Sequence, residues 1–222
     1  MLVNFISQTI QFLYELTANL GIANYGIAII LFTILIKLVL LPLTAKQVKG
    51  MRIMQELQPK VQEIQKKYKN NPQQAQQKVM ELYKEHNANP FAGCWPILIQ
   101  MPILFALFSA LRTFFDPVKH PEYVNINAAN FLWIPNLGNP DPYHILPILV
   151  VIGTFLQQKV SSPGNVEGPQ KTMLFIMPLF IGYISMKFPA GLALYWVMYS
   201  IMGIFEQLLL KRPMIKEEVG AK

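Results

Sequence analysis

The stretch from Tyr25 to Leu43 constrains the fold more than any other part of the chain. Its nineteen residues carry one charge, that of Lys37. An apolar run of this length is typical of a helix that crosses a lipid bilayer. At about 1.5 Å per residue, Lys37 lies roughly 13 Å along the helix from Lys46, the next charge, which is about the depth of one leaflet. The sequence therefore predicts a membrane span that contains a cation.

Lys37 needs a polar environment, because a cation at this depth costs at least a few kcal/mol. Three environments are compatible with the sequence. The lysine stem can snorkel toward the interface, the ammonium can occupy a water-filled pocket of the inner leaflet, or burial can keep the amine neutral. We expect the water-filled pocket, since intramembrane charges usually face a bundle interior or a wet cavity.

The composition is that of an integral membrane protein. Of 222 residues, 53% are hydrophobic and 14% are charged, and the mean hydropathy of +0.32 is too high for an ordinary soluble domain. The single cysteine, Cys94, excludes an internal disulfide. The first twenty residues contain no Lys or Arg and so resemble neither a secretory signal nor a transit peptide. We therefore expect a bacterial chain that is mature from Met1.

Apolar and polar stretches divide the chain into five predicted spans and their connections. The spans are residues 22–45, 91–111, 143–159, 172–187 and 189–210. The connections are a basic hairpin (46–90), an outer loop (112–142), a short loop (160–171) and a tail (211–222). The fourth span is short, which indicates local bilayer thinning or burial against its neighbours.

Residues 1–21 are predicted to form a separate helix. Apolar residues recur there at intervals of three and four, at Ile6, Ile10, Leu13, Leu16 and Leu20. Gln and Asn residues interrupt the segment throughout, which argues against a sixth span. The amphipathic pattern predicts an interfacial helix that lies on the extracytoplasmic surface of the membrane.

The basic segment from Lys46 to Asn89 is predicted to form a helical hairpin outside the membrane. It contains nine Lys or Arg and four Glu. Two helical runs, 47–69 and 73–86, are separated at Asn70-Asn71-Pro72, where proline suits a first helical position. Their apolar positions are spaced to form a narrow seam: Met54, Leu57, Val61, Ile64, Val79, Leu82 and Tyr83. Just before this segment, Pro42 is expected to kink the helix.

The distribution of basic residues orients the spans. Of the nineteen Lys and Arg, fifteen lie in the hairpin, in the tail or around the short loop, and three lie on the opposite side. The positive-inside rule then puts the N-terminus outside and the hairpin and the C-terminus in the cytoplasm. The predicted fold class is an all-α membrane protein with five transmembrane helices, N-out and C-in.

The sequence offers no catalytic set. No predicted span carries an Asp, and the three histidines lie in the hairpin, in the outer loop and at the outer end of the third span. Metal binding and general-base chemistry need such groups clustered within reach. A phosphate-binding GxxxxGK[ST] loop is also absent. We expect no enzyme activity, no metal and no cofactor, and ATP-driven work would need a partner.

Polar or amphipathic residues remain at membrane depth, and each can either join helices by packing or form part of a site. They are Thr33, Lys37, Gln100, Gln157, Gln158, Ser185, Tyr195, Trp196, Tyr199, Ser200 and Glu206. For Glu206 two pairings are open. It can pair at the inner interface with Lys211 or Arg212, or within the membrane with Lys37.

Four stretches resemble one known family. They are LPLTAKQ after the first span, LYKEHNANPFAGCWPILIQMPI (Leu82–Ile103), FLQQKVSSP (Phe155–Pro163) and FPAGLALYW (Phe188–Trp196). In this order they resemble the YidC/Oxa/Albino membrane protein insertases over nearly the whole chain. The resemblance implies a five-helix core with a hydrophilic groove, which is open to the cytoplasm and sideways to lipid but closed toward the outside.

The resemblance also implies roles for individual residues. The groove cation, which attracts acidic residues in a substrate tail, corresponds to Lys37, the glutamine of span three to Gln157 or Gln158, and the groove tryptophan to Trp196. Gln100, Thr33 and Tyr199 complete the candidate groove. Members of this branch usually have arginine at the position of Lys37. Lysine keeps the charge but lacks the planar fork of arginine, so we expect charge attraction rather than bidentate binding.

The expected function is therefore that of an insertase and membrane chaperone in the bacterial plasma membrane. Its partners would be nascent membrane proteins and the lipid bilayer, with the ribosome and the Sec translocon as further candidates, and no small-molecule substrate. A long basic ribosome-binding tail is absent, so ribosome contact would rest on the hairpin. Two alternatives remain: a small anion transporter or channel that uses Lys37, and a scaffold whose hairpin binds acidic lipid or ribosomal RNA.

Overall fold

The structure, a computed structural model, describes residues 1–86, 88, 95–116, 118, 120–162 and 169–210. Apart from one isolated bridge between Phe131 and Ile134, the regular elements in these ranges are helices, as the sequence predicts. They are α1 (Leu2–Asn19), α2 (Tyr25–Lys67), α3 (Pro72–Glu85), α4 (Trp95–Phe114), the short 3-10 helix η2 (Ile126–Ala128), α5 (Ile145–Ser161), α6 (Pro169–Ser185) and α7 (Ala190–Leu210). The predicted tail 211–222 lies outside the described residues.

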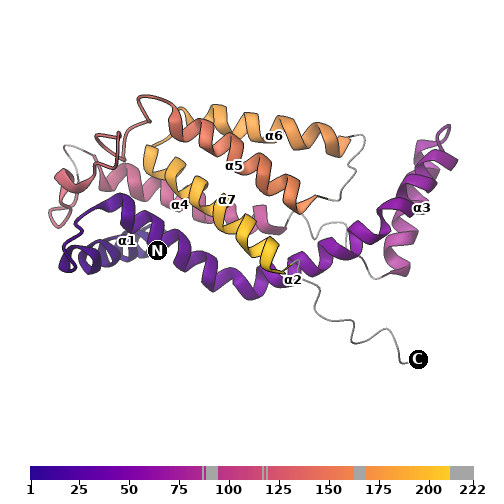
Figure 1. Ribbon diagram of the computed structural model, residues 1–222, viewed down its shortest axis with the longest axis horizontal. Coiled ribbons are helices and arrows are strands. Elements are labelled where there is room, and N and C mark those ends of the chain that lie inside the picture. The colour runs from indigo at the N-terminus through magenta and orange to yellow at the C-terminus, as the bar shows by residue number, and fades with distance from the viewer. Residues whose placement is uncertain (87, 89–94, 117, 119, 163–168, 211–222) are drawn as a thin grey trace.

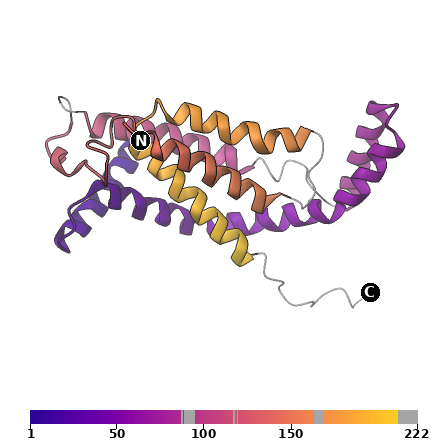
Figure 2. The ribbon, with the colours of Figure 1, turned by 45° about the horizontal axis from the view of Figure 1, so that its top comes forward.

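Helices α2, α4, α5, α6 and α7 form a bundle in which successive helices run in opposite directions (Figure 1). Helix α7 is central, because it packs against α2 and α5 and also contacts α4 and α6. Helix α1 and the loop between α4 and α5 lie at one end of the bundle, and α3 lies beyond the other (Figures 1 and 2). We call these the α1 end and the α3 end.

The bundle helices have apolar surfaces. Helices α2 and α7 are long and apolar enough to cross a membrane, and shorter apolar helical stretches occupy Gln100–Phe114, Ile145–Ser161 and Thr172–Ser185. Large apolar side chains on all five helices are exposed, among them Leu38, Phe105, Ile148, Phe180 and Phe205. An apolar surface of this extent suits lipid rather than water.

Helix α2 is longer than the sequence suggests. The predicted boundary at residue 46 does not end the helix, because the first span and the first arm of the hairpin are one helix of 43 residues. Asn24 caps its start by accepting bonds from the backbone amides of Gly26 and Ile27. Pro42 and Pro59 lie inside the helix, and Figure 1 shows α2 changing direction along its length, as internal prolines promote.

The hairpin of α2 and α3 is held together by an apolar seam. Leu57, Val61, Tyr83 and Ala88 are buried, with Ile53, Met54, Val79 and Leu82 packed around them. This confirms most of the predicted seam. An exposed ion pair joins Lys78 and Glu81 at 2.6 Å, but such surface pairs add little stability. The apolar contacts therefore hold the hairpin.

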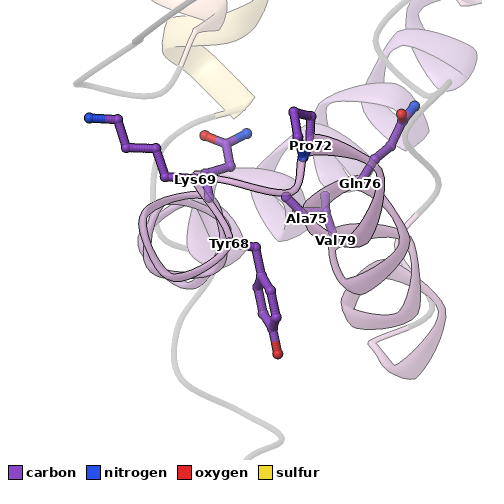
Figure 3. Close-up of a pocket in the computed structure, with 7 residues that line it drawn as sticks. Tyr68, Lys69, Pro72, Ala75, Gln76 and Val79 are labelled. Carbon is purple, nitrogen blue, oxygen red and sulfur yellow. The ribbon is translucent and has the colours of Figure 1, made fainter.

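A cavity opens where α2 and α3 meet (Figure 3). It is lined by Gln65, Tyr68, Lys69, Pro72, Ala75, Gln76 and Val79. Among these residues Ala75 is buried, and the others are half-buried or exposed. This cavity is on the hairpin, far along α2 from Lys37, and it brings together no set of ionisable groups.

Helix α1 has two apolar faces where the sequence pattern was interpreted as one. Ile6, Ile10, Tyr14 and Thr17 are buried against the bundle. Leu16 and Leu20, which were predicted to share a face with Ile6 and Ile10, are exposed. They continue an outer stripe whose members recur at intervals of three, four and seven: Leu2, Phe5, Phe12, Leu16 and Leu20. The sequence pattern was right about amphipathicity, but the apolar residues that it grouped together lie on two faces of the helix.

A tyrosine pair joins the buried face of α1 to α2 and to the loop between α4 and α5. The rings of Tyr14 and Tyr25 stack with centroids 4.0 Å apart. The Tyr25 hydroxyl donates to Gln11 Oε1 at 2.8 Å and accepts from the backbone amide of Asn125. Helix α1 is thus part of the folded unit.

Asp141 fixes the start of α5 at the α1 end. This carboxylate is 3% exposed and accepts three hydrogen bonds. The donors are Trp133 Nε1 at 3.0 Å, the Tyr143 amide at 3.1 Å and the Leu146 amide at 2.7 Å. The same loop also receives α7, because the amides of Ala190 and Gly191 donate to the carbonyls of Asn139 and Leu137. The loop between α4 and α5 therefore fixes where two bundle helices begin.

We expect Asp141→Ala to lower the free energy of unfolding by about 2–4 kcal/mol, because it leaves buried donors without an acceptor. The measurement is the thermal unfolding midpoint of the purified protein in detergent. Glu122→Ala is the matched control, since Glu122 is an exposed carboxylate of the same loop. An equal midpoint for the two variants would contradict the role assigned to Asp141.

Candidate functional site

Lys37 is buried between α2 and α7 and is paired with Glu206. Its ammonium lies 2.9 Å from Glu206 Oε2, and the side chains of Lys37 and Glu206 are 4% and 7% exposed. We call these two residues the charge pair. The structure thus takes the second of the two pairings that the sequence left open for Glu206. Lys211 and Arg212, the other candidates, lie outside the described residues.

One face of α7 forms the environment of the Lys37 ammonium. The ring centroid of Tyr199 is 3.9 Å from Lys37 Nζ, a distance at which the face of an aromatic ring attracts a cation. Tyr199, Gly203 and Glu206 follow each other at intervals of four and three and so share one side of the helix. A methyl group placed on Gly203 would lie 3.3 Å from Lys37 Nζ. The absent side chain at residue 203 leaves room for the ammonium.

Gly203 also receives Gln157 from α5. A methyl group on Gly203 would overlap the side-chain amide of Gln157. Of the two glutamines considered from the sequence, Gln157 therefore reaches the surroundings of Lys37. Gln158 is half-buried on the same helix, and no contact of its side chain with the charge pair is found in the part of the chain that the structure describes.

Gln100 joins the same region through two tyrosines. Its Nε2 donates to the Tyr195 hydroxyl at 2.8 Å, and the Tyr195 ring lies 5.9 Å from that of Tyr199. Gln100 Oε1 is buried and has no hydrogen-bond partner among the described residues. A chain of contacts thus connects α4 to Lys37 through α7.

Thr33 and Trp196 take less direct parts. Thr33 is fully buried one turn before Lys37, and its hydroxyl donates to the Ile29 carbonyl at 2.7 Å, which satisfies it within its own helix. Trp196 is half-buried and packs against the main core. We find no contact of Trp196 with the charge pair within the described ranges.

Polar contacts continue from the charge pair toward the α3 end. The Gln207 side chain donates to the Ser161 hydroxyl, and Gln55 donates to the Ser161 carbonyl. The Arg52 guanidinium donates to the carbonyl of Leu210, the last residue of α7. These bonds join the ends of α5 and α7 to the part of α2 that leads to the hairpin.

The sequence expectation of a water-filled pocket differs from the closed arrangement in the structure. The groups nearest to the Lys37 ammonium are a carboxylate and an aromatic ring, and little of the side chain is exposed. Sequence reasoning did not single out Gly203, although its spacing from Tyr199 and Glu206 was available as a signal. The sequence does not show which face of α7 contacts Lys37.

The arrangement contains one cation, Lys37, and one carboxylate, Glu206, and the two are paired with each other. It offers a cation held against an aromatic ring, with an amide group nearby. Within the described residues, no three His, Cys, Asp or Glu side chains are grouped so that they could hold a metal ion.

Comparison with known proteins identifies the family. The family described as 60Kd inner membrane protein matches residues 16–218. The membrane protein insertase YidC of Fusobacterium nucleatum is 41% identical over 209 residues, which cover 94% of this chain and 96% of the relative. The membrane protein insertase MisCA of Bacillus subtilis is 42% identical over 218 residues, which cover 96% and 78%.

A solved structure shares the fold. It is described as an active YidC insertase crystal structure with the first transmembrane domain resolved, and it superposes with a TM-score of 0.72 at 26% identity. The match covers 91% of this chain and 44% of that chain, so the chain spans less than half the length of the solved protein. The sequence resemblance is confirmed, and the chain belongs to the 60Kd inner membrane protein family, which includes the YidC membrane protein insertases.

Proposed function

We propose that this protein inserts hydrophobic segments of nascent membrane proteins, together with their short polar tails, into the bilayer without ATP. The observation that carries the proposal is the Lys37 ammonium inside an apolar bundle, held by the Tyr199 ring and beside the Gln157 amide. A fixed positive charge in the inner leaflet attracts the carboxylates of a tail that must cross, and it thereby lowers the barrier to crossing.

The proposed setting is the bacterial plasma membrane, with five spans, the N-terminus outside and the C-terminus inside. Five apolar helical stretches support this arrangement. The basic hairpin lies beyond the α3 end (Figure 2), as the positive-inside rule requires of the cytoplasmic side. The outer apolar stripe of α1 fits a helix in the outer interface.

The proposed groove lies between α2 and α5, where α7 forms its floor. Helix α7 packs against both, and Lys37, Tyr199, Gln157 and Gly203 meet there. Trp196, Gln100, Thr33 and Gln158 are proposed to line or support the same path. Among macromolecular partners, nascent membrane proteins are primary, and the ribosome and the Sec translocon remain candidates that the basic hairpin would contact.

The first test measures insertion of a single-span substrate into vesicles that contain the purified protein. Lys37→Met should lower insertion of a substrate with an acidic tail about tenfold, which corresponds to about 1.4 kcal/mol of lost attraction. Lys37→Arg should keep most of the activity because it keeps the charge. A substrate whose tail carries Asn in place of Asp should respond much less.

The double variant Lys37→Met/Glu206→Gln serves as the folding control. Removing one charge leaves the other buried and unpaired, whereas removing both avoids that penalty. Restored folding together with low insertion of the acidic tail supports the proposal. Full insertion by the double variant would show that the cation is dispensable.

A second test addresses the meeting of α5 and α7. Gly203→Ala should displace Gln157 and crowd Lys37, and so reduce insertion of the acidic-tail substrate several-fold in the same assay. Gly153→Ala is the control, because its added methyl group would meet Ser200 between the same two helices at 3.1 Å without contact to the charge pair. Equal losses in both variants would point to helix packing alone.

The third test checks the topology with a membrane-impermeant maleimide. In a Cys94→Ala background, Glu122→Cys should label in intact cells, whereas Gln76→Cys should label only after permeabilisation. Both parent residues are exposed, so accessibility to the reagent depends on the side of the membrane. The reverse labelling pattern would overturn the N-out arrangement.

A further inference from the structure

We propose that Glu206 is an internal substitute for the carboxylate of a substrate. It neutralises Lys37 before a substrate enters, and it leaves when an acidic residue of the entering tail takes its place. This inference rests on the proposed function. It adds a residue that decides how strongly acidic tails are favoured over neutral ones.

The first support is that the anion position at Lys37 is already filled. Glu206 Oε2 lies 2.9 Å from the ammonium, and both side chains are almost fully buried. A second carboxylate beside the same ammonium would be repelled by Glu206, and the repulsion is stronger where water is excluded. A substrate carboxylate can therefore bind there only by exchange.

The second support is that Glu206 lies close to the end of its helix, whereas Lys37 does not. It precedes Leu210, the last described residue of α7, by four positions, which is about 6 Å along the helix axis. A glutamate side chain covers most of that distance by changing rotamer. Lys37 comes from the interior of α2, which continues for thirty residues beyond it, and the Tyr199 ring contacts its ammonium. The carboxylate can thus leave while the cation stays.

The third support is a second donor at the same place. The Gln157 amide and the Lys37 ammonium both border the space beside Gly203. No hydrogen bond of the Gln157 side chain is found within the described ranges. A carboxylate has two oxygens, so an incoming one can accept from the ammonium with one oxygen and from the amide with the other. The site offers an entering carboxylate as many donors as it offers Glu206, or more.

The exchange of one carboxylate for another also avoids the energetic cost of leaving a buried cation unpaired. A buried cation that loses its only counterion is strongly destabilised. When one carboxylate replaces another, the ammonium stays paired before and after the step. A tail without an acidic residue provides no replacement, and this discriminates between tails without any external energy source.

The test compares wild type and Glu206→Gln in the vesicle insertion assay, with an acidic tail and with the matched Asn tail. Glu206→Gln should raise the ratio of acidic-tail to neutral-tail insertion about tenfold, because the acidic tail no longer competes with an internal carboxylate. Glu81→Gln is the control, since it removes the carboxylate of an exposed ion pair in the hairpin, and it should leave the ratio unchanged. An unchanged ratio in Glu206→Gln, or an equal fall for both tails, would overturn the exchange.

A second measurement uses the wild-type protein and does not depend on the folding of a variant. A hydrophobic carbodiimide should join the Glu206 carboxylate to the Lys37 amine as an amide, while the reagent takes up the released water and becomes a urea. Mass spectrometry of the digested protein quantifies this cross-link. Excess acidic-tail substrate should lower the yield several-fold and the Asn-tail substrate should not. Equal yields with both substrates would contradict the exchange.

The outcomes separate this inference from the proposed function. If wild-type vesicles insert neither tail above protein-free vesicles, both proposals fail. If insertion occurs and depends on Lys37, but the ratio of acidic-tail to neutral-tail insertion does not change in Glu206→Gln, only the exchange proposal fails.

Discussion

The bundle depends on a charge that cannot remain in an apolar environment without a partner. Lys37 sits in an apolar helix, and a lone cation there would destabilise the fold by several kcal/mol. One face of α7 stabilises this cation with the Tyr199 ring, the free space at Gly203 and the Glu206 carboxylate, which lie on successive turns. These contacts fix the rotation of α7 about its own axis and its position along α2. The charge pair thus joins α2 to α7, the helix that also packs against α5.

Much of the fold follows from the sequence because long apolar runs and prolines have direct structural meaning. The stretch around Lys37, the break at Asn71-Pro72 and the hairpin seam were all readable. The continuation of the helix through residue 46 was not predicted, because a change from apolar to polar composition does not end a helix. The packed side of α1 was equally hidden, because periodicity reveals two unlike faces and not the neighbour that each one meets.

The sequence predicted the cation of the site, Lys37, but did not decide its counterion, Glu206. Lys37 stands out because a charge inside an apolar run is rare, whereas Glu206 is followed closely by Lys211 and Arg212 in the sequence. Local spacing cannot distinguish a partner five residues away from one 169 residues away. Gln157 and Gln158 present the same difficulty. Adjacent residues on a helix point about 100° apart, so only the packing of α5 on α7 selects one of them.

The continuity of α2 has a mechanical consequence. A 43-residue helix spans about 65 Å, and it carries the hairpin at one end and the Lys37 ammonium nearer the other. No flexible linker separates the two. A sideways displacement of the hairpin is therefore transmitted along a stiff lever, which can yield only where Pro42 and Pro59 remove backbone hydrogen bonds. A partner that docks on the hairpin therefore acts on the same continuous helix that holds the buried charge.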